Sequence, residues 1–183
     1  MKIIGGMARG RKLKTLEGES TRPTAGKVRA ALFNILNAWI PDAEWLDLYA
    51  GSGAVGLEAV SRGAARAMLV ERAGPALQVV YQNVDTLDLA GVEVLALDVL
   101  VALPRLAGQQ FDVIFLDPPY AEDPGPALTL IAQHDLLKAD GRLVLEHHAD
   151  RVAKLMVGEK YRWLRTARYS ENSLSFYGTT PAS

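Results

Sequence analysis

Cysteine is absent from this chain of 183 residues, and histidine occurs only three times. Without cysteine the chain can form neither a disulfide framework nor a thiolate metal site. The three histidines, His134, His147 and His148, are too few for a structural zinc site, so we predict that the protein binds no metal.

Long apolar runs are also missing. No segment offers the roughly 20 apolar residues that a membrane-spanning helix needs, and residues 1–6 lack the hydrophobic core of a signal peptide. We therefore expect a cytoplasmic protein without a membrane partner. Because 49% of the residues are nevertheless hydrophobic, the chain can bury a sizeable core in essentially one domain.

The net charge of -1 conceals an uneven distribution. Residues 1–30 carry eight Lys and Arg against two Asp and Glu, residues 31–150 carry six against seventeen, and residues 151–183 carry six against two. A basic head on an acidic body indicates a polyanionic partner, although a solvated basic face is the simpler alternative. The cations that we predict to bind RNA phosphates are Arg9, Arg11, Lys12, Lys14, Arg22, Lys27 and Arg29.

Periodicity divides the chain into two parts. Ile3-Ile4 and Leu13 surround several glycines, which predicts a short hairpin, and helical spacing of apolar residues predicts a helix over residues 25–37. We therefore expect a basic hairpin-and-helix extension at residues 1–40 and the main domain at residues 41–183.

The main domain alternates strands with helices. Apolar runs predict strands at residues 45–49, 67–70, 92–97, 113–116 and 143–145, and helices are predicted between them at residues 55–61, 75–86, 99–106 and 126–137. This alternation is typical of an α/β fold with a doubly wound, mainly parallel, Rossmann-like sheet. Two later runs, residues 161–164 and 173–177, predict an antiparallel hairpin at one edge. Ligands of such sheets bind at the carboxyl ends of the strands.

A glycine-rich turn follows the first of these strands. Gly51-Ser52-Gly53-Ala54-Val55-Gly56 matches the G-x-G-x-x-G fingerprint, and Glu71 ends the next strand, where it can accept hydrogen bonds from ribose hydroxyls. These features alone fit NAD as well as S-adenosylmethionine (SAM). An NAD-dependent oxidoreductase is therefore one alternative.

Two further carboxylates favour SAM. Asp47 lies inside the first strand, where it can reach towards the cationic methionine end, and Asp98 ends the third strand, where it can accept from the adenine amine. Capping of a nearby helix is the structural alternative for both. An acidic cleft suits a sulfonium cation better than a pyrophosphate. The predicted cofactor contacts are Asp47, Ala50, Gly51, Gly53, Glu71, Asp98 and Val99.

The tetrapeptide Asp117-Pro118-Pro119-Tyr120 follows the fourth strand. Its prolines stiffen the corner and remove two backbone donors, so that the Asp117 carboxylate and the Pro118 carbonyl remain as acceptors beside an aromatic ring. Such a corner can hold the two N–H groups of an exocyclic amine and aim its lone pair at a methyl donor, while Tyr120 stacks on the base. We predict that these four residues form the catalytic corner for an unpaired or flipped base.

Together these motifs resemble the bacterial RsmD family. The resemblance rests on the glycine turn, the Asp-Pro-Pro-Tyr corner, Arg9-Gly10-Arg11-Lys12-Leu13 and Arg22-Pro23-Thr24, and it extends over nearly the whole chain. It implies a class I SAM-dependent enzyme that methylates the N2 amine of a guanine in small-subunit (16S) ribosomal RNA, with an assembly particle as substrate. It also implies that Thr24 contacts the cofactor.

Two other readings stay open at this point. A DNA adenine-N6 or cytosine-N4 methyltransferase would share the chemistry of the corner, although we find no room for a target-recognition domain. A non-catalytic RNA-binding module would keep the fold without turnover.

Overall fold

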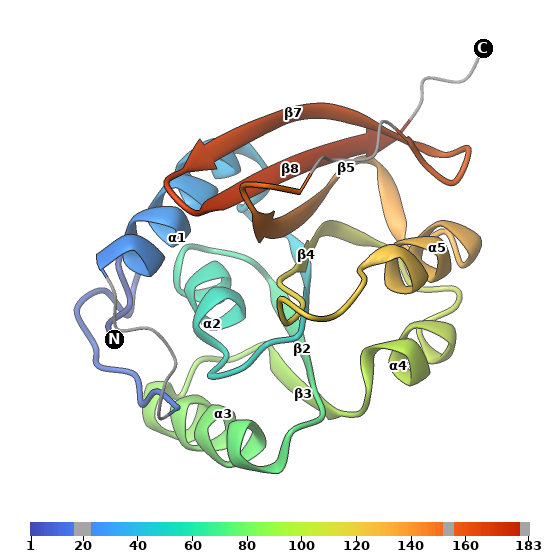
Figure 1. Cartoon of the computed structure of the whole chain (residues 1–183). Coiled ribbons are helices and arrows are strands. Elements are labelled where there is room, and N and C mark those ends of the chain that lie inside the picture. Colours follow the sequence, from blue (N-terminus) through green and yellow to red (C-terminus); the bar gives the residue numbers. More distant parts are fainter. Residues whose placement is uncertain (17–22, 152–155, 180–183) are drawn as a thin grey trace.

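One sheet organises the molecule. The computed structural model describes residues 1–16, 23–151 and 156–179, and only the backbone of residues 23 and 24. In these ranges eight strands lie in the order β3-β2-β1-β4-β5-β8-β7-β6 (Figure 1). The parallel strands are β1 (Glu44–Leu48), β2 (Arg66–Glu71), β3 (Val92–Ala96), β4 (Phe111–Leu116) and β5 (Leu137–His148), and the antiparallel edge is β8 (Asn172–Thr179), β7 (Tyr161–Tyr169) and β6 (Met156–Val157). The predicted fold class is confirmed.

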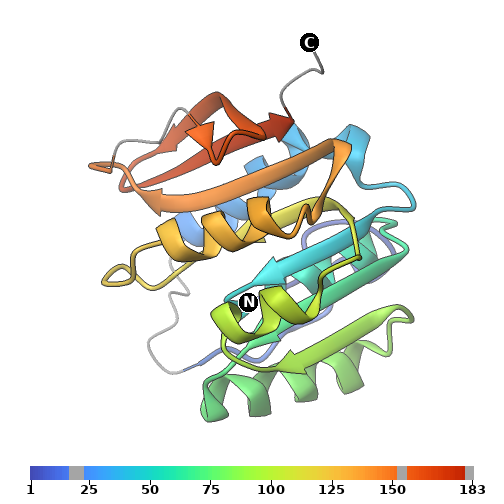
Figure 2. The same cartoon turned by 90° about the vertical axis from the view of Figure 1, so that its right-hand side faces the viewer.

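Helices cover both faces of this sheet (Figure 2). α1 (Pro23–Ile35), α2 (Ala54–Ser61) and α3 (Gly74–Leu87) pack on one face, α4 (Val99–Arg105) and α5 (Gly125–Gln133) pack on the other, and the 3₁₀ helix η1 (Asn37–Trp39) leads from α1 towards β1. Successive residues of β1 alternate between these layers. Trp45 packs in the α1–α3 layer and Leu46 in the α4–α5 layer, as the period of a strand requires.

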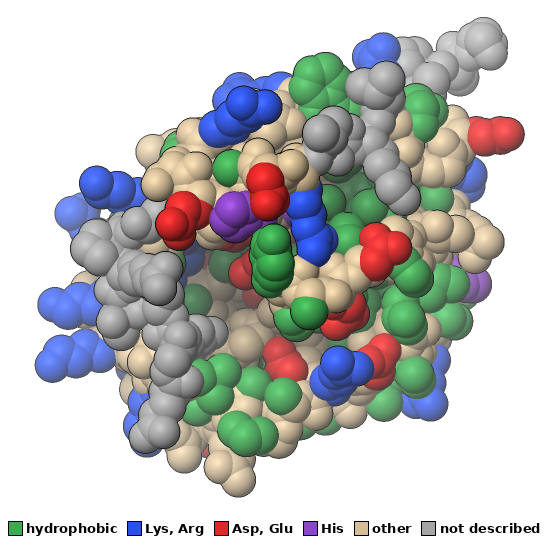
Figure 3. All heavy atoms as spheres, viewed as in Figure 1, with side chains coloured by type: hydrophobic (Ala, Val, Ile, Leu, Met, Phe, Trp, Pro, Cys, Tyr) green, Lys and Arg blue, Asp and Glu red, His purple; other side chains and the backbone are tan. Residues whose placement is uncertain are grey.

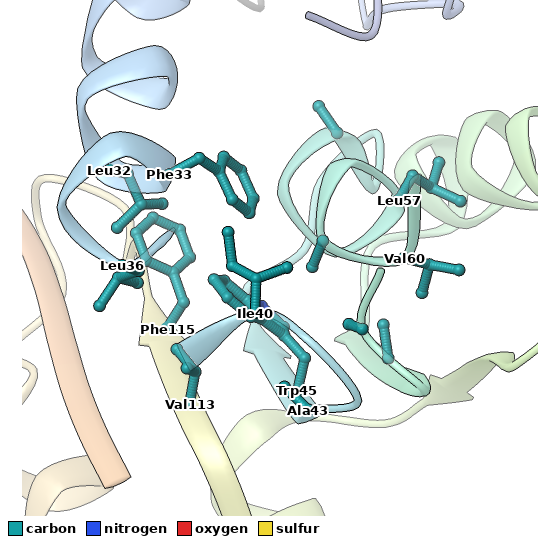
Figure 4. Close-up of a cluster of buried hydrophobic side chains, with 14 of the residues drawn as sticks. Leu32, Phe33, Leu36, Ile40, Ala43, Trp45, Leu57, Val60, Val113 and Phe115 are labelled. Atoms are coloured by element: carbon teal, nitrogen blue, oxygen red, sulfur yellow. The ribbon is translucent and has the colours of Figure 1, made fainter. Parts of the chain in front are cut away.

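The N-terminal segment shares the core of the main domain. Figure 4 shows Leu32 and Phe33 of α1 beside Trp45 of β1, and the rings of Phe33 and Trp45 stack with centroids 5.3 Å apart. Ile3 and Leu13 are buried in the same cluster. The predicted hairpin forms only a single antiparallel bridge, between Lys2 and Lys12. The division at residue 40 stays a prediction.

Several boundaries differ from the sequence-based expectation; β7, for example, continues to Tyr169 beyond the predicted end at residue 164. The helix predicted over residues 126–137 ends at Gln133, because Asp135 adopts a left-handed conformation (φ 53°) and Leu136 donates back to the Ile131 carbonyl at 3.2 Å. The strand predicted at residues 143–145 is longer and begins at Leu137. The predicted tail hairpin is present, and Ser170 (φ 56°) occupies the left-handed turn position that favours glycine.

The strand order reverses between β1 and β4. The chain winds outward from β1 through β2 to β3 and then returns to β4 on the other side of β1. Loops that leave the carboxyl ends of β1 and β4 therefore diverge and leave a crevice. The glycine turn follows β1 and the Asp117 corner follows β4, so both lie at this crevice. Within the described ranges, no helix is both long enough and apolar enough to cross a bilayer.

Candidate active site

Three adjoining hollows lie along the carboxyl ends of the strands. The largest, of about 680 Å³, is lined by Gly51, Glu71, Asp98 and the Asp117 corner. A second, of about 250 Å³, reaches Asp47, and a third, of about 230 Å³, lies beside Tyr120. Asp117 lines all three. Figure 3 shows this face with a central hollow in which acidic side chains gather, whereas most Lys and Arg project at the periphery.

The glycine turn depends on backbone conformations that side chains disfavour. Gly51 and Gly53 have φ angles of 56° and 79°. A Cβ on Gly53 would lie 2.6 Å from the Val80 Cγ2 atom, so this glycine permits packing of the turn against α3. Gly51 and Ala50 line the hollows, as predicted for cofactor contacts, whereas Gly53 supports the turn from behind.

Glu71 organises two loops at once. Its Oε2 atom accepts the N–H of Gly51 at 2.8 Å, and its Oε1 atom accepts the N–H groups of Arg72 and Ala73, each at 2.8 Å. Each carboxylate oxygen has two acceptor sites, so these three bonds leave one site, on Oε2, for a ligand hydroxyl. The carboxylate therefore stabilises the wall of the largest hollow and faces into it.

Asp98 has the capping role that was the structural alternative. Its Oδ1 atom accepts the N–H of Leu100 at 2.8 Å and caps α4, and its Oδ2 atom pairs with the Arg72 guanidinium at 2.6 Å. It also lines the largest hollow next to Val99. The capping role and a ligand contact are compatible because both oxygens retain acceptor sites.

Asp47 is a buried carboxyl at the inner end of the crevice. Only 1% of it is exposed, and its Oδ2 atom accepts the N–H of Gly56 at 2.9 Å. Burial raises the pKa of Asp47 to about 7, the hydrogen bond from Gly56 opposes this rise, and the nearby charge of Glu71 adds to it. A cationic ligand group in the adjoining hollow would favour the ionised form.

Tyr120 presents an open ring at the mouth of the cleft. It is 66% exposed, and the His148 ring meets it edge-on with a centroid separation of 5.5 Å. The guanidinium of Arg151 lies 5.2 Å from the Tyr120 ring centre and donates to the Tyr120 carbonyl. These contacts hold an aromatic plane beside a cation, an arrangement suited to a nucleotide base and its phosphate.

Glu146 and Asn172 also line the cleft, although we did not predict them. Asn172 Nδ2 donates to Glu146 Oε1 at 2.7 Å, and both residues line the two smaller hollows together with Asp117. Glu146 follows the apolar run 143–145 just as Asp117 follows residues 113–116. Its position directly after this apolar run was the signal that could have identified it.

The basic head is less uniform than predicted. Arg9, Lys12 and Lys27 are exposed. Arg11 donates to the carbonyls of Leu87, at 2.7 Å, and Thr86 at the end of α3. The exposed Lys14 donates to the Gln82 side chain at 2.9 Å. Arg22 lies outside the described residues, as does the side chain of Thr24.

The prediction that Arg29 binds phosphate is wrong. Its side chain is only 7% exposed, lies 3.5 Å from the Glu58 carboxylate and donates to the Lys2 carbonyl at 2.6 Å. Glu58 is completely buried and also accepts the N–H groups of Ile4 and Gly5. The role of Arg29 is therefore to fasten the N-terminal segment to α2.

The family model described as Conserved hypothetical protein 95 matches residues 1–178. Relatives include two proteins named Ribosomal RNA small subunit methyltransferase D. The Haemophilus influenzae protein is 36% identical over 158 residues, which cover 82% of this chain and 80% of the relative. The Escherichia coli protein is 42% identical over 120 residues, which cover 66% of this chain and 60% of the relative. The chain belongs to the RsmD family.

A solved structure with the same fold agrees with this assignment. The structure titled as the putative methyltransferase yhhF from Escherichia coli superposes with a TM-score of 0.88 at 31% identity. The superposition covers 100% of this chain and 99% of the yhhF chain.

Among the residues that the structure describes, no group of three or more His, Cys, Asp or Glu is arranged to hold a metal ion.

Proposed function

We propose that this protein transfers a methyl group from SAM to the N2 amine of a guanine in small-subunit (16S) ribosomal RNA. Membership of the RsmD family makes the chain an rRNA methyltransferase, since its relatives carry that activity in their names. The cofactor, the target atom and an assembling small-subunit particle as substrate are the proposed refinements. A cytoplasmic location belongs to the same proposal, which disfavours DNA methylation and NAD-dependent oxidation.

One observation carries the proposal. Asp117 lines the hollow that contains Gly51 and Glu71, and it also lines the hollow that contains Tyr120 and Glu146. A donor site and an acceptor site therefore meet at a single carboxylate. Methyl transfer by in-line displacement needs this proximity, because much of its rate comes from positioning the reacting atoms.

The largest hollow fits SAM better than a dinucleotide. Its lining contains four acidic side chains, Glu71, Asp98, Asp117 and Glu122, and one basic side chain, Arg72. Arg72 already pairs with Asp98, so a pyrophosphate would meet mostly negative charge. SAM supplies a methyl group on a sulfonium cation, and Glu71, Asp98 and the Gly51 turn would hold its adenosine.

The catalytic corner would orient the guanine amine so that its nitrogen can attack the methyl group of SAM. The lone pair of the guanine N2 is delocalised into the ring, so acceptors on its two N–H groups favour a geometry in which it can react. The Asp117 carboxylate and the Pro118 carbonyl are the proposed acceptors, and Tyr120 would stack on the base. Arg9, Lys12 and Lys27 would bind phosphates without reading the sequence.

Mass spectrometry of ribosomal RNA tests the proposal. Small subunits are isolated from a strain that lacks this protein and incubated with purified protein and SAM labelled on its methyl group. We expect one labelled nucleotide, N2-methylguanosine, and no label when duplex DNA replaces the subunits. Label on another base, on another guanine atom, or on DNA alone would overturn the assignment.

A further inference from the structure

Glu146 and Asp117 occupy equivalent places on neighbouring strands. β4 and β5 pair in parallel with Leu116 opposite Leu145, so Asp117, the residue after β4, lies beside Glu146, which is still within β5. Neighbouring strands are about 4.8 Å apart. The two carboxylates therefore line the same two hollows. No role has been assigned so far to Glu146.

A hydrogen bond from Asn172 orients the side chain of Glu146. The tail brings Asn172 beside β5 through the pairing of β8, in which Asn172 lies opposite His148. The Asn172 amide donates to the Oε1 atom of Glu146 at 2.7 Å, and Glu146 lines the hollow with its second oxygen, Oε2, outside this bond. Burial raises the pKa of Glu146, and the hydrogen bond from Asn172 only partly opposes this. Ligand N–H donors would stabilise the ionised carboxylate further.

The chemistry of the bases indicates which ligand fits. In guanine the exocyclic amine lies next to a ring N–H, at N1, so that edge offers donors in a row. In adenine and cytosine the ring nitrogen beside the amine is an acceptor, which would face a carboxylate with a repulsive lone pair. A second acceptor beside the amine-binding corner therefore distinguishes guanine from the other amino bases.

We propose that Glu146, oriented by Asn172, accepts the N1–H of the target guanine and thereby determines the base specificity of the enzyme. This inference rests on the proposed function and names the residue that chooses the base. Asp117 holds the amine that reacts, and Glu146 reads the neighbouring ring nitrogen. A base without a proton on N1 leaves the carboxylate unpaired and is rejected.

The test reverses the hydrogen-bonding role on each side of this contact: the base loses a donor at N1, and the protein exchanges an acceptor for a donor at residue 146. The substrates are small-subunit RNAs with either guanine or 2-aminopurine at the mapped target; 2-aminopurine keeps the N2 amine but has an acceptor at N1. In Glu146→Gln, the Asn172 amide retains its acceptor at Oε1, so the new N–H₂ group faces the base. Glu93→Gln, an exposed change on β3, is the matched control.

We expect the wild-type protein and Glu93→Gln to prefer guanine over 2-aminopurine, measured as the ratio of kcat/KM. In Glu146→Gln the rate on guanine falls roughly 10- to 100-fold and the preference shrinks or reverses. SAM affinity, measured by calorimetry, stays unchanged and shows that the variant is folded.

The outcomes separate the two proposals. If the wild-type protein methylates guanine N2 but Glu146→Gln slows both substrates equally, Glu146 is merely structural and the specificity inference fails. If the wild-type protein does not methylate guanine N2, the proposed function itself fails.

Discussion

The Oδ2 atom of Asp47 accepts the backbone N–H of Gly56 at 2.9 Å inside the protein core. Residue 56 must be small for this contact, because a Cβ there would lie 3.2 Å from the same oxygen and 3.0 Å from Leu69. The strand residue before the glycine turn and the last glycine of the fingerprint thus form one unit. This unit holds an ionisable group that is 1% exposed at the inner end of the crevice.

The stability of the protein should therefore depend on pH through Asp47. Its pKa is about 7 in the folded chain against an ordinary value of 3.8, so the folded state keeps a proton that the unfolded chain has lost between these values. The neutral Asp47 side chain contributes its full share of the free energy of unfolding below pH 4. This contribution falls as the pH rises and is lost once the pH has passed 7. We therefore expect the free energy of unfolding of Asp47→Asn to rise relative to that of the wild type by up to about 4 kcal/mol between pH 4 and pH 8.

Urea unfolding at a series of pH values measures this difference. Asp85→Asn, an exposed change on α3, is the control and should follow the wild type at every pH. A constant difference between Asp47→Asn and wild type would mean that Asp47 titrates normally.

Removal of the Asp117 carboxylate should separate catalysis from cofactor binding. We expect Asp117→Ala to lower kcat by about 100-fold or more, because one acceptor for the target amine is lost. SAM affinity should change little, since Glu71 and the Gly51 turn keep their contacts. Single-turnover methylation and calorimetry measure the two effects. Asp140→Ala, on the exposed side of β5, should retain full activity.

The exposed cations of the head should contribute affinity for RNA that depends on salt. Replacement of Arg9, Lys12 and Lys27 by alanine should reduce the slope of log affinity against log salt by about 2. A matched triple, Arg105, Lys138 and Lys160 to alanine, controls for net charge. Equal slopes for the two triples would assign the head cations to a solvated face.

Glu58 should stabilise the fold through the N-terminal segment. Glu58→Gln removes a buried negative charge that pairs with Arg29 and Arg62. Both guanidinium groups then lose the charge of this partner. We expect a loss of about 3 kcal/mol or more in the free energy of unfolding. Glu93→Gln breaks an exposed pair with Arg66 and should cost less than about 1 kcal/mol. Equal losses in the two variants would contradict the anchoring role.

The fold could be predicted because its central strands β1, β2 and β4 are buried on both faces. Strands of this kind are continuous apolar runs, such as residues 113–116, so their ends are easy to recognise in the sequence. Each run is followed by a glycine turn or a carboxylate. Residues 137–142 were harder to place. Leu137 continues the apolar pattern of α5, and only the left-handed conformation of Asp135 separates the helix from β5.

The site was predictable where it follows a motif and not where it depends on pairing across the sheet. Asp117 directly follows β4 and Glu71 is the last residue of β2, and both were identified from the sequence. Arg29 was misjudged because its charge is visible in the sequence while its buried partner, Glu58, lies 29 residues away. Asn172 was missed because its contact with Glu146 exists only through the register between β5 and β8.

The antiparallel hairpin of β7 and β8 ends in the cleft at Asn172. The tail of the chain thus forms part of the wall of the hollow proposed for the base, while residues at the ends of β1, β2 and β3 line the hollow proposed for the methyl donor. A chimera that takes residues 156–179 from a distant relative would replace the amide that orients Glu146, while the loops around Gly51 and Glu71 would stay intact.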